Sequence, residues 1–349
     1  MALAPFWFRA MKYAVPQYSA DRVNKAGELL VRPKAIFDVD ETFEIINNWR
    51  SSHAFPLNTF YVTLKGKARK IDSSCIVSQR IKRLRAITDK LSRLAWLTLS
   101  EMQDIGGCRA VVSSVNRVYR LVEIYKRSDI KHTLIDEDDY IEEPKPSGYR
   151  SYHLIYKYKS DRKHTYNICK IEMQLRSTLQ HAWATAVEVV GTHTRQALKS
   201  SQGPKDWLRF FKLMSTAIAL REKTTPVPDT PTDATILKKE LRDYAQRLHV
   251  IDHLQAYGAI FDAPDHLVGT KYFLLELNFD THRISVRPFR GKDLETASKE
   301  YLAVERAEGA EHQDAVLVSV DSLQQLRNAY PNYFLDTHKF LAFVRKTIQ

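Results

Sequence analysis

One short segment, residues 168–176 with the sequence ICKIEMQLR, sets the strongest constraint on how this chain can fold. Apolar and polar side chains alternate along it, forming two sets: Cys169, Ile171, Met173 and Leu175, and Lys170, Glu172, Gln174 and Arg176. Successive side chains of a β-strand point to opposite faces of a sheet, so the pattern predicts a strand that is buried on one face only. The polar face is either exposed to solvent or part of a functional site.

A proline-rich stretch divides the chain. At 349 residues the chain exceeds the usual size of one domain, so two domains are expected. Residues 224–235, TTPVPDTPTDAT, contain three prolines and no apolar periodicity, which is typical of a linker. We therefore predict a domain at 1–223 with an N-terminal helical extension, a linker at 224–235 and a smaller α+β domain at 236–349.

Helical and strand patterns are mixed, which favours an α/β or α+β fold. Before the linker, the patterns predict helices near 38–49, 84–94, 179–198 and 207–222, and strands at 108–112, 151–159 and 168–176. After it, they predict a helix at 236–254, a hairpin of strands 271–278 and 283–289, a helix at 294–307, a strand at 315–320, and helices at 322–329 and 337–348.

The positive charge of the chain is unevenly distributed. The formal net charge is +12, and residues 226–349 hold 15 Lys and Arg against 18 Asp and Glu, which leaves +15 on residues 1–225. A basic body with a mildly acidic C-terminal part predicts a polyanionic ligand for the first and an intramolecular partner in the second. An excess of solvated lysines is the alternative interpretation.

The sequence carries no signal for a membrane or for secretion. Its apolar runs are too short and too often broken by charge to span a bilayer, and the opening residues lack the pattern of a signal peptide. Cys75, Cys108 and Cys169 have no CxxC spacing, which argues against zinc and against a disulfide framework. These features predict a cytoplasmic protein with no membrane partner.

A second carboxylate, Asp104, lies in MQDIGGCRAVV, where Gly106 and Gly107 precede an apolar strand. Paired glycines let the backbone pass close to another element or to a ligand. Proteins usually hold Mg²⁺ with one or two carboxylates, while water and phosphate oxygens complete its shell. Glu172 is the natural partner of Asp104 in such a site, and a role of Asp104 as a helix or turn cap is the alternative.

Two further segments carry groups that suit a nucleotide. The basic residues 79–83 open the helical pattern at Leu84, and because cations oppose the dipole at a helix start, a bound polyphosphate would compensate them. The loop at 139–154, DYIEEPKPSGYRSYHL, presents Lys145, Tyr149, Arg150 and His153. A tyrosine there can stack on a base and the cations can neutralise phosphate. The alternative for residues 79–83 is a solvated charged surface, and the alternative for the loop at 139–154 is an ordinary turn with a buried tyrosine.

Four motifs, RIKRLRAITDKL, DIGGCRAVV, DYIEEPKPSGYRSYHL and IEMQLRSTLQHAWA, follow one another between Arg80 and Ala184. In this order and spacing they resemble the synthetase domain of RelA/SpoT homologues. The resemblance implies a nucleotidyltransferase-like mixed sheet flanked by helices. It also implies a pyrophosphokinase, a transferase that moves pyrophosphate from ATP to a ribose 3′-hydroxyl with Mg²⁺ as cofactor. Ala86 departs from the pattern, because many relatives have Ser there.

The resemblance assigns roles to residues by matching position. Asp104 and Glu172 would bind Mg²⁺, with Glu172 also deprotonating the attacking hydroxyl. The predicted ATP-binding residues are Arg80, Lys82, Lys90 and Arg109. The predicted acceptor-binding residues are Lys145, Tyr149, Arg150, His153, Gln174 and Arg176, with Tyr149 stacking on the acceptor base.

The C-terminal residues 271–349, which include NAYPNYFLDTHKF, resemble the antitoxin part of CapRel-like fused toxin–antitoxin proteins. That resemblance implies that Tyr330 and Tyr333 dock over the ATP site and inhibit the enzyme until a phage protein is sensed. It also implies transfer to the 3′ CCA end of tRNA, which stops translation in antiviral defence. Synthesis of (p)ppGpp from GDP or GTP and an inactive RNA-binding module are the alternatives.

Overall fold

The computed structural model describes residues 13–32, 38–194, 204–256, 260–262, 270–278, 280–281, 283–307, 313–320, 323–331, 334 and 337–349. Within these residues, nine strands form one mixed sheet in the order β3-β4-β5-β2-β1-β9-β7-β8-β6. The strands are β1 Ile76–Ile81, β2 Gly106–Val112, β3 Thr133–Asp139, β4 Tyr152–Lys157, β5 Lys170–Ser177, β6 Ile260–Asp262, β7 Thr270–Asn278, β8 Arg283–Arg290 and β9 Gln313–Ser319. The β2–β5 and β6–β8 pairs are parallel, and the other pairs are antiparallel.

Strand β1 joins the two parts of the sheet. It pairs with β2 along its whole length, from Ile76 opposite Val111 to Ile81 opposite Gly106. On its other edge it pairs with β9, where Arg80 lies opposite Val318. The strands after residue 260 therefore continue the sheet that carries the four motifs between Arg80 and Ala184. The division of the chain into domains stays a prediction.

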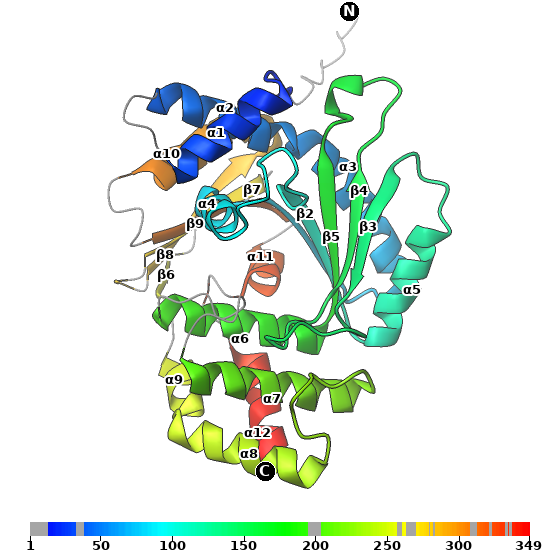
Figure 1. Cartoon of the computed structure of the whole chain (residues 1–349), viewed down its shortest axis with the longest axis vertical. Coiled ribbons are helices and arrows are strands. Elements are labelled where there is room, and N and C mark those ends of the chain that lie inside the picture. The colour runs from blue at the N-terminus through cyan, green and yellow to red at the C-terminus, as the bar shows by residue number, and fades with distance from the viewer. Residues whose placement is uncertain are drawn as a thin grey trace, which may run out of the picture.

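Helices cover both faces of this sheet (Figure 1). The helices are α1 Ala20–Val31, α2 Val39–Ser52, α3 Ala54–Ile71, α4 Leu84–Arg93, α5 Val115–Lys126, α6 Thr178–Thr194, α7 Lys205–Glu222, α8 Ala234–Arg247, α9 Val250–Ala256, α10 Leu294–Arg306, α11 Leu323–Ala329 and α12 His338–Ile348. Helices α3 and α5 pack on the apolar face of β1–β5, and α10 packs on the same side of β7 and β9. Helices α6 and α11 lie on the opposite face, and α7, α8 and α12 pack beneath α6. The fold is the mixed sheet flanked by helices that the sequence predicts.

The alternation that predicts β5 is confirmed by its burial. Ile171, Met173 and Leu175 are fully buried in the core under α3 and α5, whereas Glu172 and Gln174 are partly exposed on the other face. The hairpin predicted at 271–278 and 283–289 is confirmed as β7 and β8.

Two predictions of local structure are wrong. Residues 79–81 do not open a helix, because they belong to β1 and α4 begins only at Leu84. The helix predicted at 236–254 is broken into α8 and α9, and His249 at the break has a φ of 45°. A left-handed backbone at a residue other than glycine ends the regular hydrogen bonding of a helix.

A buried ion pair ties helix α10 to the start of α4. The carboxylate of Glu305 lies 2.7 Å from Arg50 Nη1 and accepts a hydrogen bond of 2.6 Å from the Leu84 amide. Arg50 in turn donates from Nε to the Lys82 carbonyl at 3.1 Å and lies over the Tyr301 ring. Its side chain is 2% exposed. Glu305 thus caps the helix that follows β1 and neutralises a buried guanidinium.

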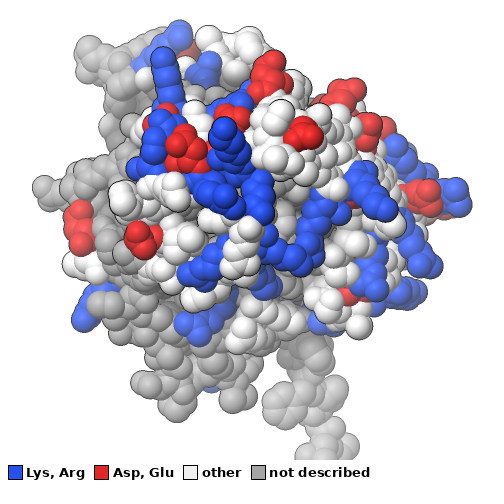
Figure 2. Space-filling model, turned by 90° about the horizontal axis from the view of Figure 1, so that it is seen from below, with Lys and Arg blue, Asp and Glu red and all other residues white. Residues whose placement is uncertain are grey.

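Basic side chains gather on one face of the molecule. Figure 2 views the molecule from below, the side on which α7, α8 and α12 lie in Figure 1, and Lys and Arg outnumber Asp and Glu there. Exposed basic residues of α8 and α12 include Lys239, Arg242, Arg345 and Lys346. The positive surface therefore extends beyond residues 1–225.

Replacing Glu305 by Ala should destabilise the chain by about 3–5 kcal/mol, because it leaves Arg50 buried without its carboxylate. The measurement is urea unfolding of the full chain. The control is Arg306→Ala, which removes a neighbouring but exposed ion pair with Asp40 and should cost less than about 1 kcal/mol. Equal losses in the two variants would contradict a special role of the buried pair.

Candidate active site

The strand registers bring the predicted site residues to one polar face of the sheet. Gln174 on β5 lies opposite His153 on β4 and Arg109 on β2. Glu172 lies opposite Gly107, which in turn lies opposite Arg80 on β1. Because side chains of directly paired residues point to the same face, these four strands present a continuous row of polar groups.

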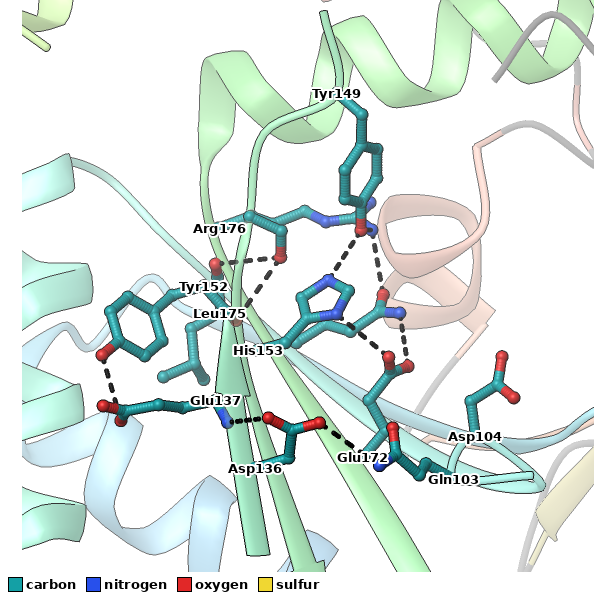
Figure 3. A network of polar contacts seen from close by, with 12 residues as sticks. Gln103, Asp104, Asp136, Glu137, Tyr149, Tyr152, His153, Glu172, Leu175 and Arg176 are labelled. Atoms are coloured by element: carbon teal, nitrogen blue, oxygen red, sulfur yellow. Dashed lines mark hydrogen bonds and ion pairs between the residues drawn. The ribbon is translucent and has the colours of Figure 1, made fainter. Parts of the chain in front are cut away.

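Five side chains of this face close a ring of polar contacts (Figure 3). Glu172 Oε1 lies 3.0 Å from Nδ1 of His153, whose Nε2 lies 2.9 Å from the Tyr149 hydroxyl. Arg176 Nη2 donates to that hydroxyl at 2.5 Å and to Gln174 Oε1 at 2.9 Å. Gln174 Nε2 donates to Glu172 Oε2 at 2.7 Å and completes the ring. Each carboxylate oxygen of Glu172 thus has a fixed partner.

The ring sets the protonation of its members. Burial opposes the charged imidazole, but the neighbouring Tyr149 and Glu172 together raise the pKa of His153 to about 9. Burial likewise disfavours the ionised Glu172, yet its contact with His153 leaves the pKa of this carboxyl lowered. At neutral pH the pair is therefore an imidazolium beside a carboxylate.

The second carboxylate, Asp104, lies between two lysines. Its Oδ2 is 2.6 Å from Lys82 Nζ and its Oδ1 is 3.0 Å from Lys90 Nζ. Although burial works in the opposite direction, the lysines hold the pKa of Asp104 well below its usual range. Burial lowers the pKa of Lys82 despite this pairing. Lys82 follows β1 and Lys90 lies on α4, so Asp104 holds these two segments together.

Asp104 and Glu172 have the donor chemistry that a magnesium site requires, and their role as its ligands stays a prediction. Figure 3 shows the side chains of Asp104 and Glu172 on the same side of the strands, and the negative charge of Asp104 acts to raise the pKa of Glu172. Mg²⁺ favours such oxygen donors and usually takes only one or two carboxylates from the protein. The described residues contain no group of three or more Asp, Glu, His or Cys side chains that could hold a metal ion.

The tyrosine loop is closed in this structure. Tyr149 is 8% exposed, and its ring lies against the Arg176 guanidinium at 5.0 Å and near Tyr140 at 6.0 Å. Lys145 Nζ lies 4.1 Å from the Tyr140 ring centroid. Gly148 allows the turn, because its φ is 91° and a Cβ there would meet Ser215 at 2.9 Å. The stacking of Tyr149 on an acceptor base stays a prediction.

Arg150 differs from the other predicted acceptor-binding residues in its contacts. It is 2% exposed, and its guanidinium donates to Ser215 Oγ and to the carbonyls of Ile141 and Thr225 at 2.6–3.0 Å. These bonds fasten the tyrosine loop to α7 and to the segment after it. In this structure these contacts give Arg150 a structural role, and its contact with the acceptor stays a prediction.

The end of α11 covers the two predicted ATP-binding arginines. Arg109 donates to the Ala329 carbonyl, and its guanidinium lies 5.4 Å from the Tyr330 ring centroid. The buried Tyr330 hydroxyl donates to the Gln79 carbonyl at 3.1 Å, next to Arg80, and burial raises its pKa. Tyr333 lies outside the described residues.

His181, which lies near Arg109 and the end of α11, was not among the predicted site residues. His181 on α6 is buried, and its Nε2 lies 3.3 Å from the Asn328 carbonyl at the end of α11. A single histidine on a mostly apolar helix gives no signal of its own. Its place in the motif IEMQLRSTLQHAWA was the only indication in the sequence.

Part of this chain is similar in sequence to known proteins. Residues 79–192 match the family model described as the region found in RelA / SpoT proteins. Two curated relatives are GTP pyrophosphokinases of Bacillus subtilis (strain 168). YwaC is 33% identical over 112 residues, which cover 30% of this chain and 52% of YwaC. YjbM is 35% identical over 116 residues, which cover 31% of this chain and 52% of YjbM. The chain thus spans about half the length of the curated relatives it matches.

Solved structures of similar proteins include small alarmone synthetase 1 from Bacillus subtilis, bound to its product pppGpp. It has a TM-score of 0.42 and 25% identity, and the match covers 53% of this chain and 94% of that chain. A GTP pyrophosphokinase family protein from Streptococcus pneumoniae has a TM-score of 0.42 and 22% identity, over 62% of this chain and 98% of that chain. No helix in the described part of this chain has the length and apolar character to cross a bilayer.

The raised pKa of His153 gives the site a pH dependence with a definite sign. Because the folded pKa of about 9 lies above the ordinary value, the pair with Glu172 stabilises the fold fully below about pH 6.5 and loses this contribution as the pH rises through 9. An NMR titration should place the midpoint of His153 near 9. The midpoint should fall markedly in Glu172→Gln and stay near 9 in Glu137→Gln, which removes a carboxylate that contacts Tyr152 instead. An unchanged midpoint in Glu172→Gln would contradict the assignment.

Proposed function

We propose that this chain is a pyrophosphokinase that transfers the terminal pyrophosphate of ATP to a ribose 3′-hydroxyl. The observation that carries the proposal is the pair of carboxylates, Asp104 and Glu172, on one polar face that also holds Lys82, Arg80 and Arg109. Phosphoryl transfer requires positioning and neutralisation of charge more than a covalent nucleophile. The RelA/SpoT region at 79–192 and the two GTP pyrophosphokinase relatives support the same reaction class.

Each group has a chemical task in this reaction. The ribose oxygen would attack the β-phosphorus of ATP while the bond between that phosphorus and the α–β bridging oxygen breaks, so that AMP leaves. The proton of the hydroxyl would pass to Glu172. His153 and Gln174 hold both oxygens of Glu172 and fix its direction. Lys82, Lys90 and Arg109 would neutralise the phosphates. A magnesium ion held by Asp104 and Glu172 would supply further charge neutralisation.

For the acceptor we favour a guanine nucleotide, GDP or GTP. The two named relatives are GTP pyrophosphokinases, which supports a guanine nucleotide as the acceptor. The 3′ CCA end of tRNA is the second candidate. It is supported by the charge of +15 on residues 1–225 and by the basic face in Figure 2, because binding to RNA depends on neutralising phosphates.

An assay with labelled ATP separates these acceptors. The full-length protein is incubated in turn with GDP, GTP and bulk tRNA, and we expect the label on the guanine nucleotides. Label on tRNA alone would favour the toxin, and label on none of them would favour the inactive RNA-binding module. Glu172→Gln and Asp104→Asn should each reduce transfer about 100-fold or more. Asp136→Asn, which removes a nearby carboxylate that contacts only Gln103 and a backbone amide in the described structure, should retain activity.

We also propose that the C-terminal part inhibits the enzyme, as in a fused toxin–antitoxin protein, and that a phage protein relieves the inhibition. The contacts of Tyr330 and Ala329 with the Gln79 carbonyl and Arg109 support this proposal, because they occupy the side of the site assigned to ATP. Tyr333 would act with Tyr330.

Tyr330→Ala in the full chain, alone or with Tyr333→Ala, should raise the rate of transfer about 5-fold or more, because the cover over Arg109 is lost. Tyr330→Phe keeps the ring but loses the bond to Gln79, so its rate should lie between those of the wild type and Tyr330→Ala. Turnover of labelled ATP and growth of cells that make each variant are the measurements. Equal rates in all of them would refute inhibition through this tyrosine.

A further inference from the structure

Two buried side chains, Arg176 and His181, and the partly buried Arg109 meet beneath the end of α11. Arg109 on β2, Arg176 on β5 and His181 on α6 are close enough that the two arginines lower the pKa of His181, after burial, which has the larger effect. Burial and then Arg176 also lower the pKa of Arg109 to about 10. Glu188, also on α6, is the carboxylate that acts on Arg109 and His181. Like charges in a buried position are costly unless an anion joins them.

Several polar atoms of this cluster have no hydrogen-bond partner. In the described part of the chain these atoms are Arg109 Nε, Arg176 Nε and Nη1, and His181 Nδ1. His181 Nε2 faces a carbonyl and therefore carries the proton of the neutral ring, so the unpaired donors are the three guanidinium nitrogens. Buried donors are almost always paired in proteins, so these N–H groups indicate a missing acceptor. An open cavity of about 440 Å³ adjoins His181 and is also lined by Thr178, Thr185 and Lys339.

The partners that the cluster does have are backbone carbonyls. Arg109 donates to the carbonyl of Ala329, and His181 Nε2 faces that of Asn328. These are the last two residues of α11, where carbonyl groups lack partners within the helix. Carbonyl oxygens are acceptors but carry no net charge, so they satisfy the cluster only in part.

We propose that Arg109, Arg176 and His181 form a phosphate subsite, and that the carbonyl end of α11 takes the place of phosphate oxygens in the closed protein. The proposal rests on the proposed function and adds His181 as a ligand-binding residue. Arg176 is four residues from Glu172 on the same face of β5, and Gln174 between them accepts from Arg176 and donates to Glu172, so a phosphate bound there lies close to the reacting groups. Withdrawal of α11 would free the donors for the phosphate of a nucleotide.

Binding of inorganic pyrophosphate, measured by calorimetry, tests the subsite without any turnover. Tyr330→Ala should bind pyrophosphate more tightly than the wild type, because α11 is loosened. Adding His181→Leu to it should weaken binding about 10- to 100-fold, the effect of losing a hydrogen bond to a charged group. His181→Gln, which keeps a donor at a similar reach, should restore most of the affinity. Thr185→Val, one turn away on the same cavity, should leave it unchanged.

These outcomes test the phosphate subsite independently of the proposed enzymatic activity. Dependence of pyrophosphate binding on His181 supports the subsite even if no acceptor is ever labelled. Repeating the titrations with ATP and with GDP assigns the subsite to one substrate. It belongs to the ATP site if His181→Leu weakens the binding of ATP, and to the acceptor site if His181→Leu weakens the binding of GDP. Unchanged binding in the folded His181→Leu variant, or equal losses in His181→Leu and His181→Gln, would overturn the proposal. If His181→Leu does not fold, the ¹⁵N shift of His181 Nε2 in Tyr330→Ala must respond to pyrophosphate, and no response would overturn it.

Discussion

The pairing of β1 on both of its edges is the constraint on which the rest of the structure depends. Its ladder with β2 fixes Arg80 and Lys82 relative to Asp104 and the polar row on β5. Its shorter ladder with β9 fixes the C-terminal strands to the same frame. Helix α11, in contrast, contacts the arginines through carbonyls and the Tyr330 ring and adds no strand. It is thus the element whose displacement would open the site and leave the sheet intact.

The electrostatics of the site also distinguish the groups fixed by the sheet from those that contact α11. Each carboxylate already has cationic partners: Asp104 has two lysines, and Glu172 has the imidazolium of His153. Such pairs keep both groups ionised and hold their positions before any substrate binds. The cluster under α11 differs, because Arg109 and His181 form hydrogen bonds with backbone carbonyls, although the charge of Glu188 also acts on them. In the described structure this cluster keeps buried guanidinium nitrogens without a hydrogen-bond partner, whereas the carboxylates of the site are held by charged partners.

How much the sequence could predict depends on whether a feature is local. The alternation in β5 is a property of neighbouring residues, so the buried and polar faces were predicted correctly. Strand β1 was missed because its residues Ser78 to Arg80 are polar, and Ser78 and Gln79 are buried only once the strand pairs with β2 and β9. The burial of Arg150 could not be predicted for the same reason, since its partners Ser215 and Thr225 lie far along the sequence. The proximity of Asp104 and Glu172 follows from the parallel β2–β5 pairing, which the motif resemblance implies and composition does not.

The C-terminal part contacts the two faces of the sheet in different ways. On one face, Glu305 of α10 caps α4 and neutralises Arg50, so it supports the segment that carries Lys82 and Lys90. On the other face, the end of α11 covers Arg109. Deleting the whole C-terminal part would remove the support together with the cover and would also expose the edge of β1. A loss of activity after such a truncation would therefore not argue against inhibition by α11, because only a change confined to α11 separates the two effects.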